Sequence, residues 1–161
     1  MYLLALIVPF CLAYFILGAI FSLFFDGKLP SFSLSKSARS LLVIVSFALG
    51  VFAIISSVSD PELGNRIEHA LGGGALASLI CFLAVKDTRV SIGRFQFFVF
   101  VALIVTSLGV LNEIVEFFLQ THTRIIFSGN ALDTWRDLSS NTAGIALALA
   151  ALSPFVAKRE R

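Results

Sequence analysis

The stretch FQFFVFVALIVTSLGVLNEIVEFFLQ, residues 95–120, decides the fold of this chain. It is a long, almost uninterrupted apolar run, and Asn112, Glu113, Glu116 and Gln120 appear only in its last turns. A helix of about 20 apolar residues crosses the hydrocarbon core of a bilayer. The stretch therefore predicts a transmembrane helix. Two glutamates near the end of so apolar a helix require an explanation.

The composition extends this prediction to the whole chain. Of its 161 residues, 58% are hydrophobic and only 14% are charged, whereas soluble domains carry about 25% charged residues. So much apolar surface indicates that the lipid bilayer is the surrounding solvent. The net charge of +2 is too small and too scattered to suggest a nucleic-acid partner. We predict a single, all-α, multi-pass membrane domain with five spans at about 3–25, 41–58, 63–85, 95–119 and 132–156.

The basic residues predict an orientation. Nine of the twelve Lys and Arg residues lie in the loops after the first and third predicted spans and in the C-terminal tail, and three lie in the other two connections. Because cytoplasmic loops are enriched in Lys and Arg, the N-terminus is predicted outside and the C-terminus in the cytoplasm.

Polar residues recur every three or four positions at the predicted outer ends of the last three spans. Positions three or four apart share a helical face, so we expect these spans to pack around one polar cluster, with the first two spans outside it. The candidate ligand-binding residues are Arg66, His69, Asn112, Glu113, Glu116, Asp133, Arg136, Asp137 and Asn141.

Caps and small residues support this packing. Asp60 is predicted to cap a helix with Pro61 at its first position, and Asn130 to cap the last span. The run GGGALAS (72–78) and the stripe through Gly144 are small faces that let helix backbones approach closely in lipid.

Charges this deep in a membrane indicate a functional site unless they only neutralise one another. One imidazole and several carboxylates could also hold a divalent ion, but no metal-binding motif such as H-E-x-x-H is present, and no metal ligands are assigned. Ser139 and Ser140 follow Asp137, but no G-x-S-x-G elbow supports a serine nucleophile.

Three motifs carry a family resemblance: NRIEHALGGG (65–74), NEIVEFF (112–118) and DTWRDLSSNTAG (133–144). Their order resembles the VanZ-like and YjdF-like group of small polytopic bacterial membrane proteins. The run D-T-W-x-D and the doubled glutamate look closer to the YjdF side. The resemblance implies a multi-pass protein of the bacterial cytoplasmic membrane and supports a site at these positions.

The leading functional prediction is a membrane protein that binds a lipid headgroup or a cell-envelope amphiphile in an acid-rich outer pocket. The alternative is a metal-dependent enzyme acting on a lipid-linked substrate, with His69 and the carboxylates as ligands and Glu116 as general base. A small transporter and a pure scaffold are the remaining interpretations. Enzymatic turnover and the identity of any cofactor stay open at this point.

Overall fold

The computed structural model describes residues 2–123 and 131–156, with side chains from Ile7 onward. This part of the chain is helical and contains no strand. The elements are α1 (Tyr2–Asp26), α2 (Leu34–Ser57), α3 (Pro61–Ile67), the π-helical segment η1 (Glu68–Leu76), α4 (Ala77–Thr88), α5 (Arg94–His122), α6 (Ala131–Leu152) and the 3₁₀ turn η2 (Ser153–Phe155).

Five stretches of the described chain are long and apolar enough to cross a membrane, and α3, η1 and α4 join into one of them. The five predicted spans are thereby confirmed. The largest difference is at α2, which begins at Leu34 rather than at residue 41. The polar run before residue 41 continues the helix because Lys36 and Arg39 can extend from its first turns toward water. The predicted cap at Asp60 is also present, since its Oδ1 accepts from the backbone N–H of Glu62 at 2.9 Å.

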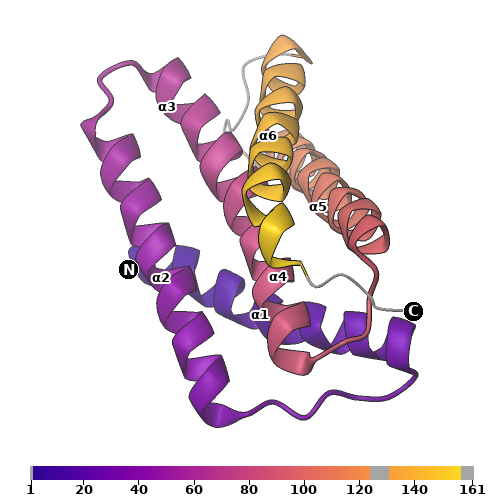
Figure 1. Cartoon of the computed structure of the whole chain (residues 1–161). Helices are drawn as coiled ribbons and strands as arrows, with labels where there is room; N and C mark the ends of the chain where they lie inside the picture. Colours follow the sequence, from indigo (N-terminus) through magenta and orange to yellow (C-terminus); the bar gives the residue numbers. More distant parts are fainter. Residues whose placement is uncertain (1, 124–130, 157–161) are drawn as a thin grey trace.

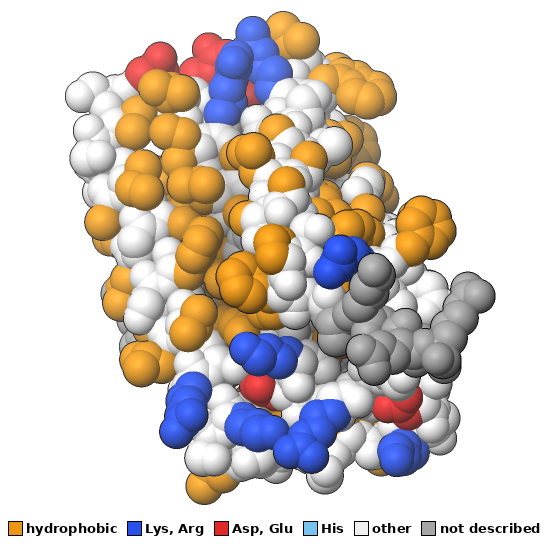
Figure 2. Space-filling view, in the orientation of Figure 1, with side chains coloured by type: hydrophobic (Ala, Val, Ile, Leu, Met, Phe, Trp, Pro, Cys, Tyr) orange, Lys and Arg blue, Asp and Glu red, His pale blue; other side chains and the backbone are white. Residues whose placement is uncertain are grey.

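The spans that follow α1 run between the same two ends of the molecule, and α1 crosses them near one end (Figure 1). The loops at 27–33 and 89–93 lie at this end. Figure 2 shows Lys and Arg side chains gathered there, below a wide area of hydrophobic side chains. Exposed leucines such as Leu12, Leu42 and Leu103 contribute to the apolar surface. Such a surface suits lipid as the surrounding solvent.

The apolar core lies where α1, α2, α4 and the first half of α5 meet. Its fully buried members include Tyr14, Phe21, Ile44, Ile80, Phe97 and Val101. The remaining contact surface, between η1, α6 and the second half of α5, is much more polar. The bundle thus separates an apolar packing region at one end from a polar region at the other.

The contact between η1 and α6 is the closest of the helix packings. A Cβ atom on Gly144 would collide with the backbone carbonyl of Ala70, and one on Gly74 would collide with the backbone of Asn141. Glycine is therefore required on both sides, as the small faces predicted. This contact fixes which residues of the two helices stand opposite each other.

Candidate functional site

Three helices each contribute one ionisable side chain to a common point in the polar region. These are His69 of η1, Glu113 of α5 and Asp137 of α6, which we call the polar triad. One nitrogen or oxygen atom of each residue lies within 4.8 Å of the others. Glu113 and Asp137 are buried and His69 is nearly so. The closest pair is His69 Nε2 and Asp137 Oδ2, at 3.4 Å.

Each of the three helices carries a second residue of the site four positions from its triad residue. His69 lies four residues before Gly73, Asp137 lies four before Asn141, and Glu113 lies four after Gly109. Positions four apart stack along one helix face, so a second layer lies one turn deeper than the triad. In this layer, Asn141 fills the space that Cβ atoms at Gly73 and Gly109 would occupy.

The π-helical geometry of η1 coincides with this site. A π-helix pairs each N–H with the carbonyl five residues earlier, and such segments occur often at functional sites. Here the segment begins at Glu68, one residue before His69, and includes all three glycines of Gly72–Gly74. The unusual backbone therefore underlies both the histidine and the glycine face that meets α6.

Asn65 is a site residue that the sequence reasoning missed. Its Nδ2 donates a hydrogen bond of 2.8 Å to Asp137 Oδ1, across the α3–α6 contact. The position of Asn65 four residues before His69 was the available signal, because it repeats the spacing of Asp133, Asp137 and Asn141.

Arg66 and Arg136 do not join the triad. Both contact Glu62 Oε1 at 2.6 Å. These three residues, called the arginine cluster, are partly exposed at the end of the bundle. The two arginines thus pair with a different carboxylate, and the buried acids of the triad gain no direct partner from them.

The arginine cluster borders a groove of about 400 Å³ between α3 and α6. Its walls include the side chains of Arg66, Arg136, Trp135 and Ser140. The tryptophan is 67% exposed. Positive charge, hydroxyl groups and an exposed aromatic ring therefore meet at one hollow.

The other predicted residues lie around the triad rather than in it. Asn112 Nδ2 donates to Glu116 Oε1 at 2.6 Å on the exposed side of α5. Asp133 is half-buried in the first turn of α6. Glu113 and Glu116 thus have different surroundings. Glu116 has an amide partner, whereas Glu113 points into the bundle.

The carboxylate of Glu113 is buried at the contact of three helices. The residue is 7% exposed, and neither of its side-chain oxygens has a hydrogen-bond partner among the described residues. The side-chain oxygen of Asn141, one turn deeper, is likewise unpaired there. Buried polar atoms are almost always paired, so each exception calls for an explanation. Here two exceptions lie next to each other at the same three-helix contact.

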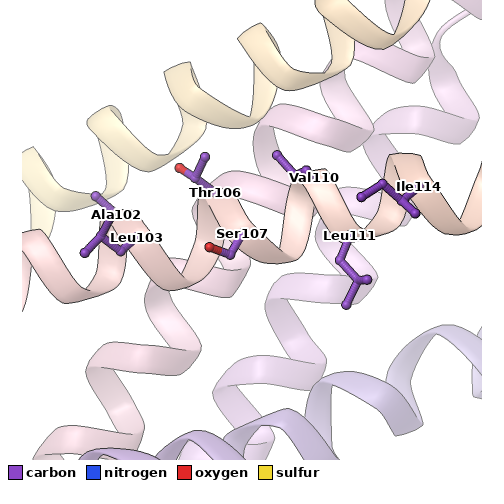
Figure 3. Close-up of a pocket in the computed structure, with 7 residues that line it drawn as sticks. All are labelled: Ala102, Leu103, Thr106, Ser107, Val110, Leu111 and Ile114. Carbon is purple, nitrogen blue, oxygen red and sulfur yellow. The ribbon is translucent and has the colours of Figure 1, made fainter.

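A second groove, of about 620 Å³, runs along α5 from Ala102 to Ile114 (Figure 3). Thr106 and Ser107 supply its hydroxyl groups, and the rest of its lining is apolar. Because no charged residue lines it, this groove offers no basis for selecting a headgroup.

Comparison with known families places the chain. A family model described as "Predicted membrane protein (DUF2238)" matches residues 4–158. The chain belongs to this family. No curated protein and no solved structure gives a significant match. Membership in DUF2238 agrees with the five apolar helices, whereas the resemblance to VanZ-like and YjdF-like proteins stays a prediction.

Proposed function

We propose that this DUF2238 protein binds the anionic, phosphate-bearing headgroup of a membrane amphiphile in the groove between α3 and α6. The observation that carries the proposal is the arginine cluster beside that groove. Arg66 and Arg136 both contact the carboxylate of Glu62, so two guanidinium groups lie together beside the groove. Guanidinium groups bind phosphate through paired, charge-assisted hydrogen bonds.

The position of the groove supports a lipid ligand over a soluble one. Trp135 is largely exposed beside the two arginines, and tryptophan is enriched where the hydrocarbon region meets the headgroups. Ala143 adds an apolar wall deeper along α6 than Arg136, and Leu132 adds one in the first turn of that helix. A lipid with its headgroup at the arginines and the start of its hydrocarbon chain along the apolar wall would match both the charged and the apolar parts of the groove.

The predicted orientation would place this groove at the outer face of the bacterial cytoplasmic membrane. Lipids and envelope precursors with exposed phosphates are then the natural ligands. The acid-rich triad is not part of the phosphate site, because two carboxylates would repel an anion. This assigns separate roles to the arginines and to the acids, which the sequence had grouped together.

Lipid retention by the purified protein tests the proposal. Wild-type protein, delipidated in mild detergent, is offered equal amounts of phosphatidylglycerol and phosphatidylcholine, and bound lipid is measured by native mass spectrometry. We expect phosphatidylglycerol to be preferred. The double variant Arg66→Gln/Arg136→Gln should lose this preference by about tenfold, because hydrogen bonds to charged groups contribute about 1.5–3 kcal/mol.

The matched control is Lys28→Gln/Arg39→Gln, which removes two exposed positive charges from the other end of the bundle. It should leave the preference unchanged. Equal retention of phosphatidylglycerol by wild type and by the Arg66→Gln/Arg136→Gln variant would refute the proposal. So would an equal loss in both double variants, since net charge alone would then account for binding.

A further inference from the structure

We propose that the polar triad is a binding site for one divalent transition-metal ion, with His69, Glu113 and Asp137 as its protein ligands. The three come from separate helices, and one potential ligand atom of each lies within 4.8 Å of the others. The site is distinct from the arginine cluster, so this inference is independent of the proposed amphiphile binding.

The spacing of the triad is close to that of a loaded metal site. Histidine and carboxylate ligands lie about 2.0–2.2 Å from zinc, so two ligands on opposite sides of an ion are about 4.2 Å apart. The 3.4 Å between His69 Nε2 and Asp137 Oδ2 suits adjacent ligands. The limit of 4.8 Å for all three ligand atoms is somewhat wider than this, so the set would have to contract on binding an ion.

The unpaired state of Glu113 is the independent observation that points to a ligand. Its carboxylate is more than nine-tenths buried and lacks a hydrogen-bond partner among the described residues. An uncompensated buried charge is costly. The nearest arginines contact Glu62 instead. A divalent cation would balance the charges of Glu113 and Asp137 together and satisfy the free oxygens.

The surroundings of Asp137 also resemble those of a metal ligand. Asn65 holds Oδ1 by a hydrogen bond of 2.8 Å and leaves Oδ2 directed at His69. Metal-binding carboxylates are typically oriented by such outer hydrogen bonds. Asn141 lies one turn deeper with its side-chain oxygen unpaired. The site therefore has a supporting partner as well as three ligands.

The ligand types indicate which ions fit. Mg²⁺ and Ca²⁺ prefer shells of oxygen atoms, whereas an imidazole with carboxylates suits Zn²⁺, Mn²⁺ or Fe²⁺. Neither cysteine belongs to the cluster, so soft ions such as Cu⁺ are not favoured. Zn²⁺ and Mn²⁺ are accordingly the probes to use, with Ca²⁺ as the comparison ion.

The experiment measures metal content and affinity of the full-length protein in detergent. Wild type is stripped with a chelator, incubated with Zn²⁺, Mn²⁺ or Ca²⁺, desalted and analysed by mass spectrometry of the metal. We expect one Zn²⁺ or Mn²⁺ per chain and no retained Ca²⁺. His69→Gln and Glu113→Gln should weaken binding by more than Asn65→Ala, for which a loss of about tenfold is expected for an outer hydrogen-bond partner.

Glu68→Gln is the matched control, because Glu68 is exposed and adjacent to His69 on η1. It should bind the ion like wild type. Co²⁺ provides a second readout, since its visible absorption reports the ligand set and should change in His69→Gln. Size-exclusion chromatography identifies any variant that does not fold, in which case the wild-type stoichiometry and the Asn65→Ala affinity decide.

The outcomes separate the two proposals. A wild-type protein that retains neither Zn²⁺ nor Mn²⁺ would overturn the metal site, as would equal affinity in wild type and folded Glu113→Gln. Metal bound at the triad without any preference for phosphatidylglycerol would leave the metal site standing and remove the amphiphile proposal. A preference for phosphatidylglycerol without metal bound at the triad would refute the metal site and leave the amphiphile proposal standing.

Discussion

Two carboxylates that lie between helices, one at each end of this bundle, differ in the hydrogen-bond donors around them. Near the end with the loops 27–33 and 89–93, Asp87 Oδ2 accepts hydrogen bonds from the hydroxyls of Tyr14 and Ser40, both at 2.6 Å. At the other end, Glu113 has no such donor among the described residues. The first carboxylate joins α1, α2 and α4, and the second faces a histidine and another acid.

The difference separates a structural polar group from a candidate site. Asp87, Tyr14 and Ser40, together with Ser37 at 3.3 Å from the tyrosine oxygen, form what we call the hydroxyl cluster. Hydrogen bonds to a charged acceptor stabilise a fold when the donors are in place. An acid held without donors costs stability, and proteins tolerate such costs mainly at functional sites. The two ends both contain a carboxylate, so they are distinguished by whether that carboxylate has hydrogen-bond donors.

The largest expected contrast is in accessibility of the two ends from outside the cell. In a background with Cys11 and Cys81 replaced by Ala, Ser35→Cys and Ser91→Cys at the hydroxyl-cluster end should not react with an impermeant thiol reagent. Thr123→Cys at the triad end should react fully. All three positions are exposed on the protein. Labelling of Ser35→Cys and Ser91→Cys from outside would invert the orientation that the basic residues predict.

Removal of Asp87 should produce the largest loss of stability. Asp87→Ala deletes the acceptor of two hydrogen bonds and leaves the hydroxyls of Tyr14 and Ser40 unpaired between helices. We expect a loss of about 3 kcal/mol in the free energy of unfolding, measured by denaturant titration in detergent. Asp26→Ala, at the exposed end of α1, is the control and should change it by less than about 0.5 kcal/mol. If Asp87→Ala changed the free energy of unfolding by as little as the control does, the hydroxyl cluster would not stabilise the fold.

A smaller loss is expected where η1 meets α6. Gly144→Ala places a methyl group against the backbone carbonyl of Ala70, and such overpacking costs about 1–3 kcal/mol. In contrast, Gly50→Ala on α2 meets nothing within 4 Å and should stabilise its helix by about 0.5–1 kcal/mol. Thermal unfolding of the two variants measures the difference. If the two variants unfolded at the same temperature, the contact between η1 and α6 would not set the register of the triad.

The smallest effect on stability should come from the triad itself. Glu113→Gln removes a buried carboxylate without a partner, so in metal-free protein the unfolding temperature should hold or rise. Glu116→Gln, which alters the exposed pair with Asn112, should change the free energy of unfolding by less than about 0.5 kcal/mol. A marked loss in Glu113→Gln alone would show that Glu113 is structural, like Asp87.

Much of the fold was predictable because the bilayer imposes simple rules on sequence. Apolar runs of the required length predict the five spans, since backbone polar groups in lipid must be satisfied within helices. The cap at Asp60 follows from local chemistry alone. The gathering of polar residues on the last three spans was also predictable, because their spacings of three and four place them on single faces.

What the sequence determined by itself is therefore the set of helices and the polar face that each one carries. Tertiary structure alone decided which polar residues meet. The close contact between Gly74 and Gly144 and the π-helical turn through His69 turn Asn65, rather than Arg66, toward Asp137. They also leave Glu113 inside and Glu116 outside. The physical reason is that periodicity describes one helix at a time, whereas register depends on steric fit between two surfaces. The hydroxyl cluster has the same origin, because Tyr14 and Asp87 are far apart in the chain and meet only where α1 crosses α4.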